Sequence, residues 1–217
     1  MAQPDILEVA RICGWAAARL CREVRALADS PEALYKDSRE PVTLADYGSQ
    51  AVILEEVSRT FPGHGVVAEE GAAHLRAEAD DRLQKVLRRL VSEILARRVD
   101  FDQVCDWIDH RGDSSSEYTW VIDPIDGTKG FLRGDQYAVA IGVLKAGKPW
   151  AGVLACPNLP IDPADPEGGR GLLFVAQRGK GALRASLDFS LEEPISVSEV
   201  SDPAGIRVLG SVESAHG

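Results

Sequence analysis

"VIDPIDGTKGF" (Val121–Phe131) is the segment in which the architecture and the chemistry of this chain are most readily recognised. An apolar run ends at Asp123, Pro124 fixes a turn, and Asp126 comes back beside the first aspartate. Gly127 then opens a turn or helix whose N–H groups point outward, where phosphate oxygens bind well. Because turns are rich in such residues, the segment alone is compatible with a plain acidic turn or with a metal site that holds phosphate.

Two other acidic segments favour the metal site. Asp123 and Asp126, together with the turned carbonyl of Ile125, offer the hard oxygen ligands that Mg²⁺ prefers. The segment "VVAEEG" (66–71) also places acids at the end of a predicted strand, and "VTLADYGSQ" (42–50) places one near the start of a predicted helix. Each of these alone is typical of a solvated surface, but the three together indicate a shared acidic site.

The composition limits the classes of partner. The 217 residues, 45% of them hydrophobic, can bury a sizeable core. A formal charge of −10 and a pI of about 4.9 argue against nucleic acid or an anionic membrane as the main partner. Clustered carboxylates can instead recruit divalent cations, which then bind phosphate, so a small anionic substrate is compatible with this charge.

The cysteines predict neither disulfides nor a zinc site. Cys13 and Cys21 are roughly 12 Å apart along a predicted helix, too far for a disulfide, and no C-x-x-C pair is present. We expect these two, Cys105 and Cys156 to be reduced and mostly buried. No apolar stretch reaches about 18 residues, and residues 1–20 carry no cleavage-type signal, so we predict a soluble, cytoplasmic protein without a membrane partner.

Periodicity predicts helices packed on a mainly antiparallel sheet. Helical spacing of apolar residues is found at 4–28, 44–60 and 83–95. Strand patterns are found within 65–71 and at 118–122, 136–144, 150–155 and 171–177. The proline-rich segment 156–171 is interpreted as an excursion between the last two strands, and 110–117, which contains Arg-Gly-Asp, as a mobile loop.

Four segments carry a resemblance to a known family: "EPVTLADYGSQ" (40–50), "VVAEEG" (66–71), "WVIDPIDGTKGFLRGDQYAVAIGVL" (120–144) and "SVESAH" (211–216). They resemble the lithium-sensitive, magnesium-dependent phosphatase superfamily of inositol monophosphatase, and within it the 3′(2′),5′-bisphosphate nucleotidases. The run Lys129–Gly134 discriminates between the two, because inositol phosphatases tend to have Asn-Phe soon after the shared Asp-Gly-Thr. The resemblance covers almost the whole chain.

The resemblance implies a role for each matching residue. The implied Mg²⁺ ligands are Glu69, Asp123, the Ile125 carbonyl and Asp126, with Glu70 orienting the site from behind them. Asp46 and Thr128 are the implied pair that activates the attacking water. The substrate would be held by Gly127, Thr128 and His216.

The implied function is a Mg²⁺-dependent, lithium-sensitive phosphatase of sulfur metabolism. It would use a metal-activated water to hydrolyse the 3′-phosphate of adenosine 3′,5′-bisphosphate to AMP and phosphate, with 3′-phosphoadenylyl sulfate as a further substrate. One alternative is an inositol or sugar phosphate phosphatase, and another is a non-catalytic, truncated metal-binding relative. The partner is thus a small phosphorylated nucleotide, and the sequence leaves the oligomeric state open.

The resemblance also implies a fold and a missing part. The fold is the layered α/β/α/β/α sandwich of the family, of which this chain holds mostly the N-terminal α+β part. Residues 1–184 would form that catalytic domain, and 185–217 would begin a truncated α/β domain that supplies a further metal-binding aspartate and nucleotide-binding Ser and Lys residues. We therefore expect the chain alone to bind Mg²⁺ weakly, to show little phosphatase activity and to self-associate.

Overall fold

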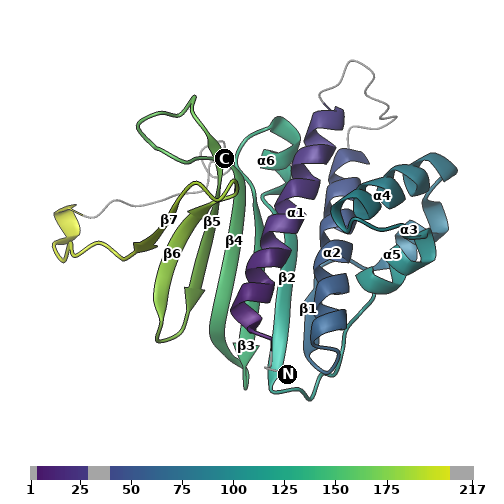
Figure 1. The fold of residues 1–217 in the computed structure, drawn as a ribbon, viewed down its shortest axis with the longest axis horizontal. Coiled ribbons are helices and arrows are strands. Elements are labelled where there is room, and N and C mark those ends of the chain that lie inside the picture. The colour runs from purple at the N-terminus through teal and green to yellow at the C-terminus, as the bar shows by residue number, and fades with distance from the viewer. Residues whose placement is uncertain (1–3, 29–39, 206–217) are drawn as a thin grey trace.

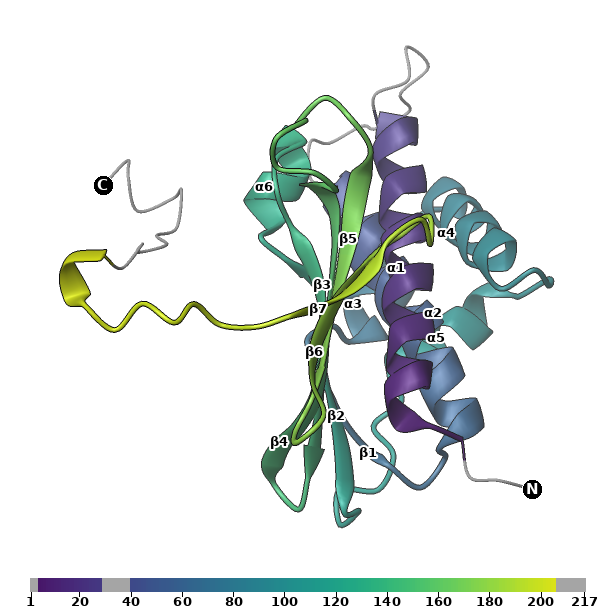
Figure 2. The ribbon, with the colours of Figure 1, turned by 60° about the vertical axis from the view of Figure 1, so that its left-hand side comes forward.

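The computed structural model describes residues 4–28 and 40–205, which form one mixed sheet with most of the helices on one of its faces (Figures 1 and 2). The sheet has seven strands in the order β1-β2-β3-β4-β5-β6-β7. The strands are β1 (Gly65–Ala68), β2 (Tyr118–Asp126), β3 (Ala138–Lys145), β4 (Lys148–Pro160), β5 (Arg170–Gln177), β6 (Gly181–Ser186) and β7 (Glu192–Ile195). The helices are α1 (Ile6–Ala28), α2 (Glu40–Thr60), α3 (Ala72–Glu78), α4 (Asp81–Ile94), α5 (Phe101–Ile108), α6 (Thr128–Arg133) and the 3₁₀ turn η1 (Pro203–Gly205).

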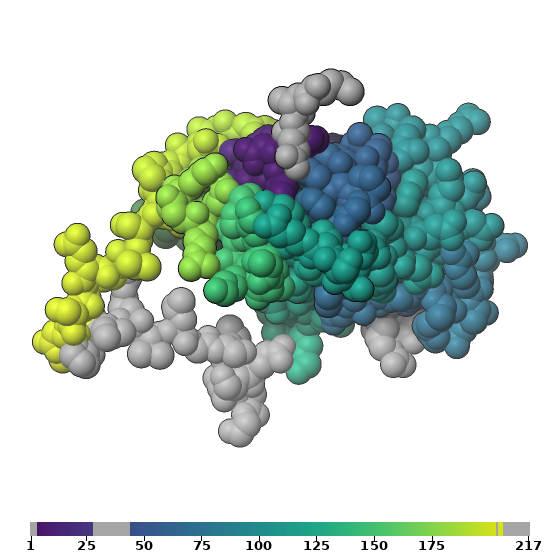
Figure 3. Space-filling view, turned by 90° about the horizontal axis from the view of Figure 1, so that it is seen from below, coloured from purple at the N-terminus to yellow at the C-terminus, as the bar shows by residue number. Residues whose placement is uncertain are grey.

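Helix α1 lies directly on the sheet, and α2 packs beside it (Figure 1). The apolar stripe of α1 faces the core, and Leu20 and Val24 in this stripe are fully buried. Gly14 allows the close approach, because a Cβ there would lie 2.9 Å from the side chain of Val153 on β4. In the space-filling view the surfaces of these two N-terminal helices, purple and blue, adjoin each other and the later, teal and green part of the chain (Figure 3). The predicted helices at 4–28, 44–60 and 83–95 are confirmed as α1, α2 and α4.

Among the strands of residues 4–28 and 40–205, β1 and β2 run parallel and every other neighbouring pair is antiparallel. The β1–β2 register pairs Val66 with Trp120. At the start of this pair the His64 ring stacks between Phe61 (centroids 4.7 Å apart) and Tyr118 (5.1 Å), and the Trp120 indole donates to His64 Nδ1 at 3.1 Å. Because parallel strands end at the same edge of a sheet, the acids that follow β1 and end β2 are brought together.

The structure corrects three predicted boundaries. Helix α2 begins at Glu40 rather than residue 44, since the proline at position 41 is tolerated in a first turn. Strand β3 begins at Ala138 rather than 136. Strand β4 continues to Pro160, so the first part of the predicted excursion is strand; the ladder to β5 is irregular between Cys156 and Pro160, which accommodates the prolines.

The sheet face opposite the helices is apolar and open among the described residues (Figure 2). Val121 is 38% exposed and Leu154 is 45% exposed, and together with Phe174 and Ile195 they line a shallow groove of ≈ 470 Å³.

The division of the chain at residue 184 stays a prediction. No helix in the described ranges is long and apolar enough to cross a membrane.

All four cysteines are free thiols, as predicted. Burial raises the pKa of Cys21 to about 12 and holds the pKa of Cys13 even further above its ordinary value. Burial likewise raises the pKa of Cys105 and of Cys156 to about 11. The thiolate forms are therefore scarce near neutral pH, and the cysteines serve packing rather than chemistry.

Candidate active site

The acidic loop after β1 lies against the end of β2. The Glu69 N–H donates to the Ile122 carbonyl at 3.3 Å, which continues the β1–β2 pairing by one residue. Burial and the neighbouring carboxyl group of Glu69 raise the pKa of Asp123 to about 6. Asp123 Oδ1 also accepts the Ile125 N–H at 3.1 Å, so the turn holds this carboxyl group in place.

The turn after Asp123 positions the other predicted residues. The β2–β3 ladder is irregular between Asp123 and Asp126, and Asp126 is exposed at the strand end. Gly127 has φ +90°, a left-handed conformation that glycine adopts readily. Thr128 begins α6, as the prediction of a turn or helix required, and its hydroxyl donates to the Ile125 carbonyl at 3.3 Å.

Asp46 faces this cluster from α2. Burial, together with the charges of Glu70, Glu69 and Asp123, raises its pKa to about 8. Burial is also the main cause of the raised pKa of Glu70 and of Asp123, the latter to about 6. Acids from three separate segments therefore influence one another's pKa, and their shared role in a metal site stays a prediction.

Two residues that the sequence did not indicate hold the acidic loop in place. The fully buried Gln50 side chain accepts the Glu70 N–H at 2.9 Å and donates to the Glu70 carbonyl at 2.8 Å and the Ile108 carbonyl at 2.9 Å. Arg111, from the Arg-Gly-Asp tripeptide, donates to the same Glu70 carbonyl at 2.8 Å. Gly112 passes so close to the His64 carbonyl that a Cβ there would lie 1.8 Å from its oxygen. The tripeptide therefore belongs to the support of the acidic loop.

The donor set suits a hard divalent cation. Within the described ranges no three Asp, Glu, His or Cys side chains are spaced to hold a metal ion in this conformation. The chemistry of the set still fits, because Glu69, Asp123 and Asp126 are hard oxygen donors next to the Ile125 carbonyl, and their mutual repulsion would be relieved by a positive ion. Three assignments stay predictions: this ligand set, the water-activating pair Asp46 and Thr128, and the substrate contacts of Gly127 and Thr128. His216 lies outside the described residues.

The raised pKa values predict how the metal-free protein responds to pH. The folded pKa of Asp46, about 8, lies above its unfolded value of about 3.9, so the folded state binds a proton that the unfolded state releases between these pH values. The free energy of unfolding should therefore fall as pH rises from about 4 to 8, by at most about 1.4 kcal/mol per pH unit for one proton. Denaturant unfolding in EDTA measures this slope.

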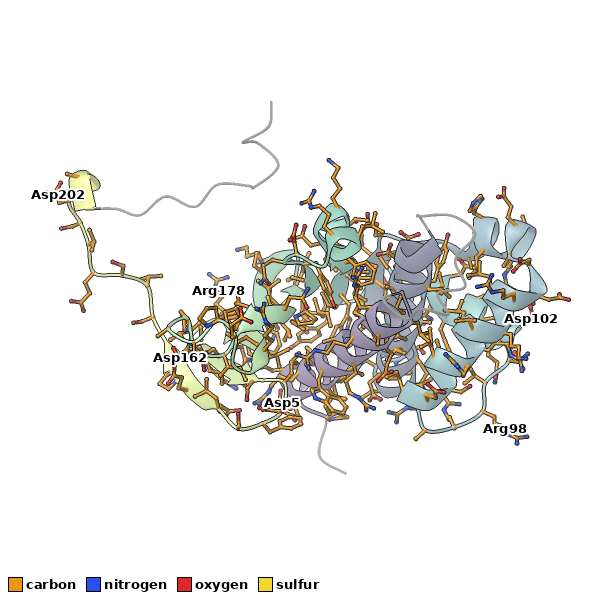
Figure 4. The ribbon with its side chains drawn as sticks, turned by 90° about the horizontal axis from the view of Figure 1, so that it is seen from above. Asp5, Arg98, Asp102, Asp162, Arg178 and Asp202 are labelled. Atoms are coloured by element: carbon orange, nitrogen blue, oxygen red, sulfur yellow. The ribbon has the colours of Figure 1, made fainter. Side chains whose placement is uncertain are left out.

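A matched pair of variants isolates the site's share of that slope. Asp46→Asn should flatten the decline, whereas Asp102→Asn, at an 85%-exposed carboxylate on α5, should leave it unchanged. Figure 4 labels Asp102, on the side of the molecule away from the strands. An unaltered slope in Asp46→Asn would show that this carboxyl group is ionised in the folded protein at neutral pH.

Comparison with known proteins gives this geometry its context. A family model described as "Inositol monophosphatase family" matches residues 4–216. The 3′(2′),5′-bisphosphate nucleotidase 1 of Arabidopsis thaliana is 39% identical over 240 residues, covering 100% of this chain and 67% of that protein. A 3′(2′),5′-bisphosphate nucleotidase of Emericella nidulans is 35% identical over 208 residues, covering 83% of this chain and 58% of that protein. The chain thus spans only part of the length of these relatives.

Solved structures show the same fold. An inositol monophosphatase from Anabaena superposes with a TM-score of 0.52 at 26% identity, covering 90% of this chain and 50% of that one. Mycobacterium tuberculosis SuhB gives a TM-score of 0.53 at 22% identity, covering 91% and 53%, and shows the fold alone. The predicted fold class is confirmed.

Proposed function

Because this chain belongs to the inositol monophosphatase family, we propose that it is the metal-binding part of a Mg²⁺-dependent phosphatase that removes the 3′-phosphate of adenosine 3′,5′-bisphosphate. The observation that carries the proposal is the acidic cluster, in which Asp46, Glu69 and Asp123 come from separate segments and meet at one edge of the sheet. A structural acidic surface would spread such charges apart, whereas a cation site requires them together.

The choice of nucleotide rests on the relatives and on one segment. The curated relatives named above are 3′(2′),5′-bisphosphate nucleotidases at up to 39% identity. The Lys129–Gly134 run, which distinguishes them from inositol phosphatases in the sequence, forms most of α6 and its C-cap beside the acidic cluster. Both points favour the nucleotide over an inositol phosphate.

In this proposal the residues of the chain divide the work. A divalent cation held by Glu69, Asp123, Asp126 and the Ile125 carbonyl would supply positive charge for the phosphate oxygens and lower the pKa of a bound water. Asp46 accepts the proton of the attacking water, and Thr128 orients that water. The bond from phosphorus to the ribose oxygen breaks as the bond to the water oxygen forms, so no side chain is phosphorylated.

Thr128→Ala is expected to lower kcat by roughly 10²- to 10⁴-fold with little change in KM. The reason is that the hydroxyl aligns the water and does not grip the nucleotide. Because Thr128 is exposed and its hydroxyl donates to the Ile125 carbonyl at the surface of the described structure, the fold should persist. Steady-state kinetics decide the point, with Thr128→Ser as the control that restores activity. Wild-type kcat with a raised KM would make Thr128 a phosphate ligand only.

The function itself is tested by phosphate release. Adenosine 3′,5′-bisphosphate and inositol 1-phosphate are assayed side by side, with Mg²⁺, with EDTA, and with Mg²⁺ plus Li⁺, using this chain and any longer form of the protein. The proposal expects magnesium-dependent, lithium-inhibited release from the nucleotide. Faster phosphate release from inositol 1-phosphate would show that the proposed substrate is wrong. Undiminished release from the nucleotide in EDTA would show that the reaction does not depend on a metal ion.

A further inference from the structure

Two backbone carbonyl groups, those of Glu70 and Ile108, accept hydrogen bonds from the same two side chains; we call them the carbonyl pair. The Gln50 amide donates to them at 2.8 Å and 2.9 Å, and the Arg111 guanidinium donates to each of them at 2.8 Å. Gln50 comes from α2, which lies between α1 and α5 in Figure 1, and Arg111 follows α5. The acidic loop and the end of α5 are therefore joined through one shared set of donors.

The buried glutamine has a single orientation in which all of these groups are satisfied. Gln50 is fully buried, so its amide needs partners inside the protein. Its nitrogen donates to both members of the carbonyl pair, and its oxygen accepts the Glu70 N–H at 2.9 Å. Rotation of the amide by half a turn would place its oxygen against two carbonyl oxygens. The Gln50 side chain is therefore fixed before any ligand arrives.

These hydrogen bonds fix the backbone on both sides of Glu69. The Glu69 N–H donates to the Ile122 carbonyl on β2 at 3.3 Å, and the next N–H, that of Glu70, donates to Gln50 at 2.9 Å. The Glu70 carbonyl is then held by both donors of the carbonyl pair. A metal ligand works within about 0.5 Å of its productive position, so a shift of this backbone would weaken the binding of a cation by Glu69.

We propose that Gln50 and Arg111 are positioning residues for the divalent cation, and that they set its affinity for the acidic cluster through the backbone of Glu69 and Glu70. The inference rests on the proposed function, in which Glu69 is a ligand of that cation. Neither positioning side chain would contact the cation. Because each of them serves both carbonyls, the carbonyl pair keeps one donor at each oxygen when either residue is lost, and keeps neither donor when both are lost.

Arg111 distinguishes an effect of position from an effect of charge. Its three acceptors in the described structure, the carbonyl pair and the His110 carbonyl at 2.9 Å, are all neutral. On charge alone, loss of an arginine near the acidic cluster should strengthen the binding of a cation, because like charges repel. A weaker affinity in Arg111→Met would therefore come from the lost position of the backbone.

Calorimetric titration with Mg²⁺ tests the inference without any substrate. Gln50→Met keeps the size of the buried side chain and removes its hydrogen bonds, so it should raise the Kd for Mg²⁺ roughly 10- to 100-fold, the usual cost of losing a residue behind metal ligands. Arg111→Met should raise the Kd by less than about 10-fold, because Gln50 still holds both carbonyls. The effect of the double variant should exceed the product of the two single effects, as expected for residues that share partners.

Turnover supplies a second readout, which a general loss of stability would not produce. The Mg²⁺ concentration that gives half of the maximal rate should rise together with the Kd, whereas kcat at saturating Mg²⁺ should stay within about threefold of the wild type. Unfolded protein would instead lower kcat at every Mg²⁺ concentration. Arg111→Lys, which keeps a charged donor, should recover part of the affinity that Arg111→Met loses.

Two control variants lie outside the carbonyl pair. Gln103 on α5 also binds the backbone, since its side-chain oxygen accepts the Asp100 N–H at 3.0 Å. Gln103→Met is therefore the matched control for Gln50→Met, and it should leave the Mg²⁺ affinity unchanged. Arg178→Met, at an exposed arginine after β5 labelled in Figure 4, is the control for one lost positive charge and should also leave the affinity unchanged.

The outcomes separate this inference from the proposed function. Wild-type or tighter Mg²⁺ affinity in the double variant, or the same loss of affinity in Gln103→Met, would overturn the role of Gln50 and Arg111 while leaving the phosphatase intact. Mg²⁺ binding by the wild-type chain without turnover would refute the proposed activity and leave the calorimetric test in force, and no Mg²⁺ binding would refute both. If Gln50→Met did not fold, Arg111→Met would decide alone: weaker affinity supports the inference, and equal or tighter affinity overturns it.

Discussion

Asp123→Asn is expected to abolish Mg²⁺-dependent turnover while the protein stays folded. The carboxylate belongs to the acidic cluster, where Glu69 and Asp126 both raise its pKa, and its charge is the part that a cation would use. Loss of a residue behind the ligands typically costs 10- to 100-fold in metal affinity, so loss of a ligand should exceed about 100-fold. Asparagine can still accept the Ile125 N–H through its side-chain oxygen, which preserves the turn. Calorimetric titration with Mg²⁺ and phosphate-release kinetics measure the two effects.

Stability separates this outcome from simple unfolding. Because repulsion and burial raise the pKa of Asp123 to about 6, removal of its charge should leave the metal-free protein as stable as the wild type at neutral pH, or more so. Asp126→Asn should likewise lose Mg²⁺ affinity, and Asp102→Asn serves as the exposed control for one lost carboxylate. Wild-type Mg²⁺ affinity in both Asp123→Asn and Asp126→Asn would remove the pair from the ligand set.

Gly130→Ala is expected to destabilise the fold by about 3 kcal/mol, at the upper end of the usual effect of overpacking. Gly130 is buried inside α6, and a Cβ there would lie 2.1 Å from the Gln136 carbonyl oxygen. That oxygen belongs to the backbone, so α6 and the following segment would have to move apart. For a chain of this size the change corresponds to a fall of roughly 6–12 °C in Tm, measurable by calorimetry.

Gly63→Ala is the matched control, because nothing lies within 4 Å of a Cβ at that position. It should change Tm little. Displacement of α6 should also shift Thr128, so Gly130→Ala is expected to lose activity at temperatures where it remains folded. If Gly130→Ala melted with the wild type, α6 would have to be free to move away from Gln136 at no cost.

The sequence anticipated the acidic cluster because each acid follows a local signal. Glu69 and Asp123 follow apolar segments, so the pattern places them at strand ends, and Asp46 lies near the start of a predicted helix. Gln50 and Arg111 have no such signal. Both side chains donate to the Glu70 and Ile108 carbonyls. Ile108 is 58 residues from Gln50 and Glu70 is 41 residues from Arg111, so these contacts exist only once the helix and the strands have packed.

The helices and strands that the sequence does not predict, among them α5, β6 and β7, are short or depend on pairing with a neighbouring strand. Strand β6 needs β5 as a partner and β7 needs β6, although the turn at Gly179 and Gly181, both with positive φ, marks the β5–β6 hairpin in the sequence. Helix α5 carried a readable signal, since Asp100 and Gln103 form a capping box. The predicted strand at 150–155 is shorter than β4 because prolines usually end a strand. In the structure the irregular ladder to β5 accommodates the prolines at the end of β4.

The parallel β1–β2 pair has a consequence for the length of the chain between the strands. The connection carries α3, α4 and α5, yet its two ends are clamped together: Gln50 bridges Glu70 and Ile108, and the Ala72 N–H donates to Asp109 Oδ1 at 2.8 Å. Residues inserted between these two ends enlarge the loop without separating the ends. Each doubling of a flexible loop costs only about 0.6 kcal/mol of closure entropy. The helical excursion can therefore lengthen or shorten over evolutionary time while the carboxylates keep their places.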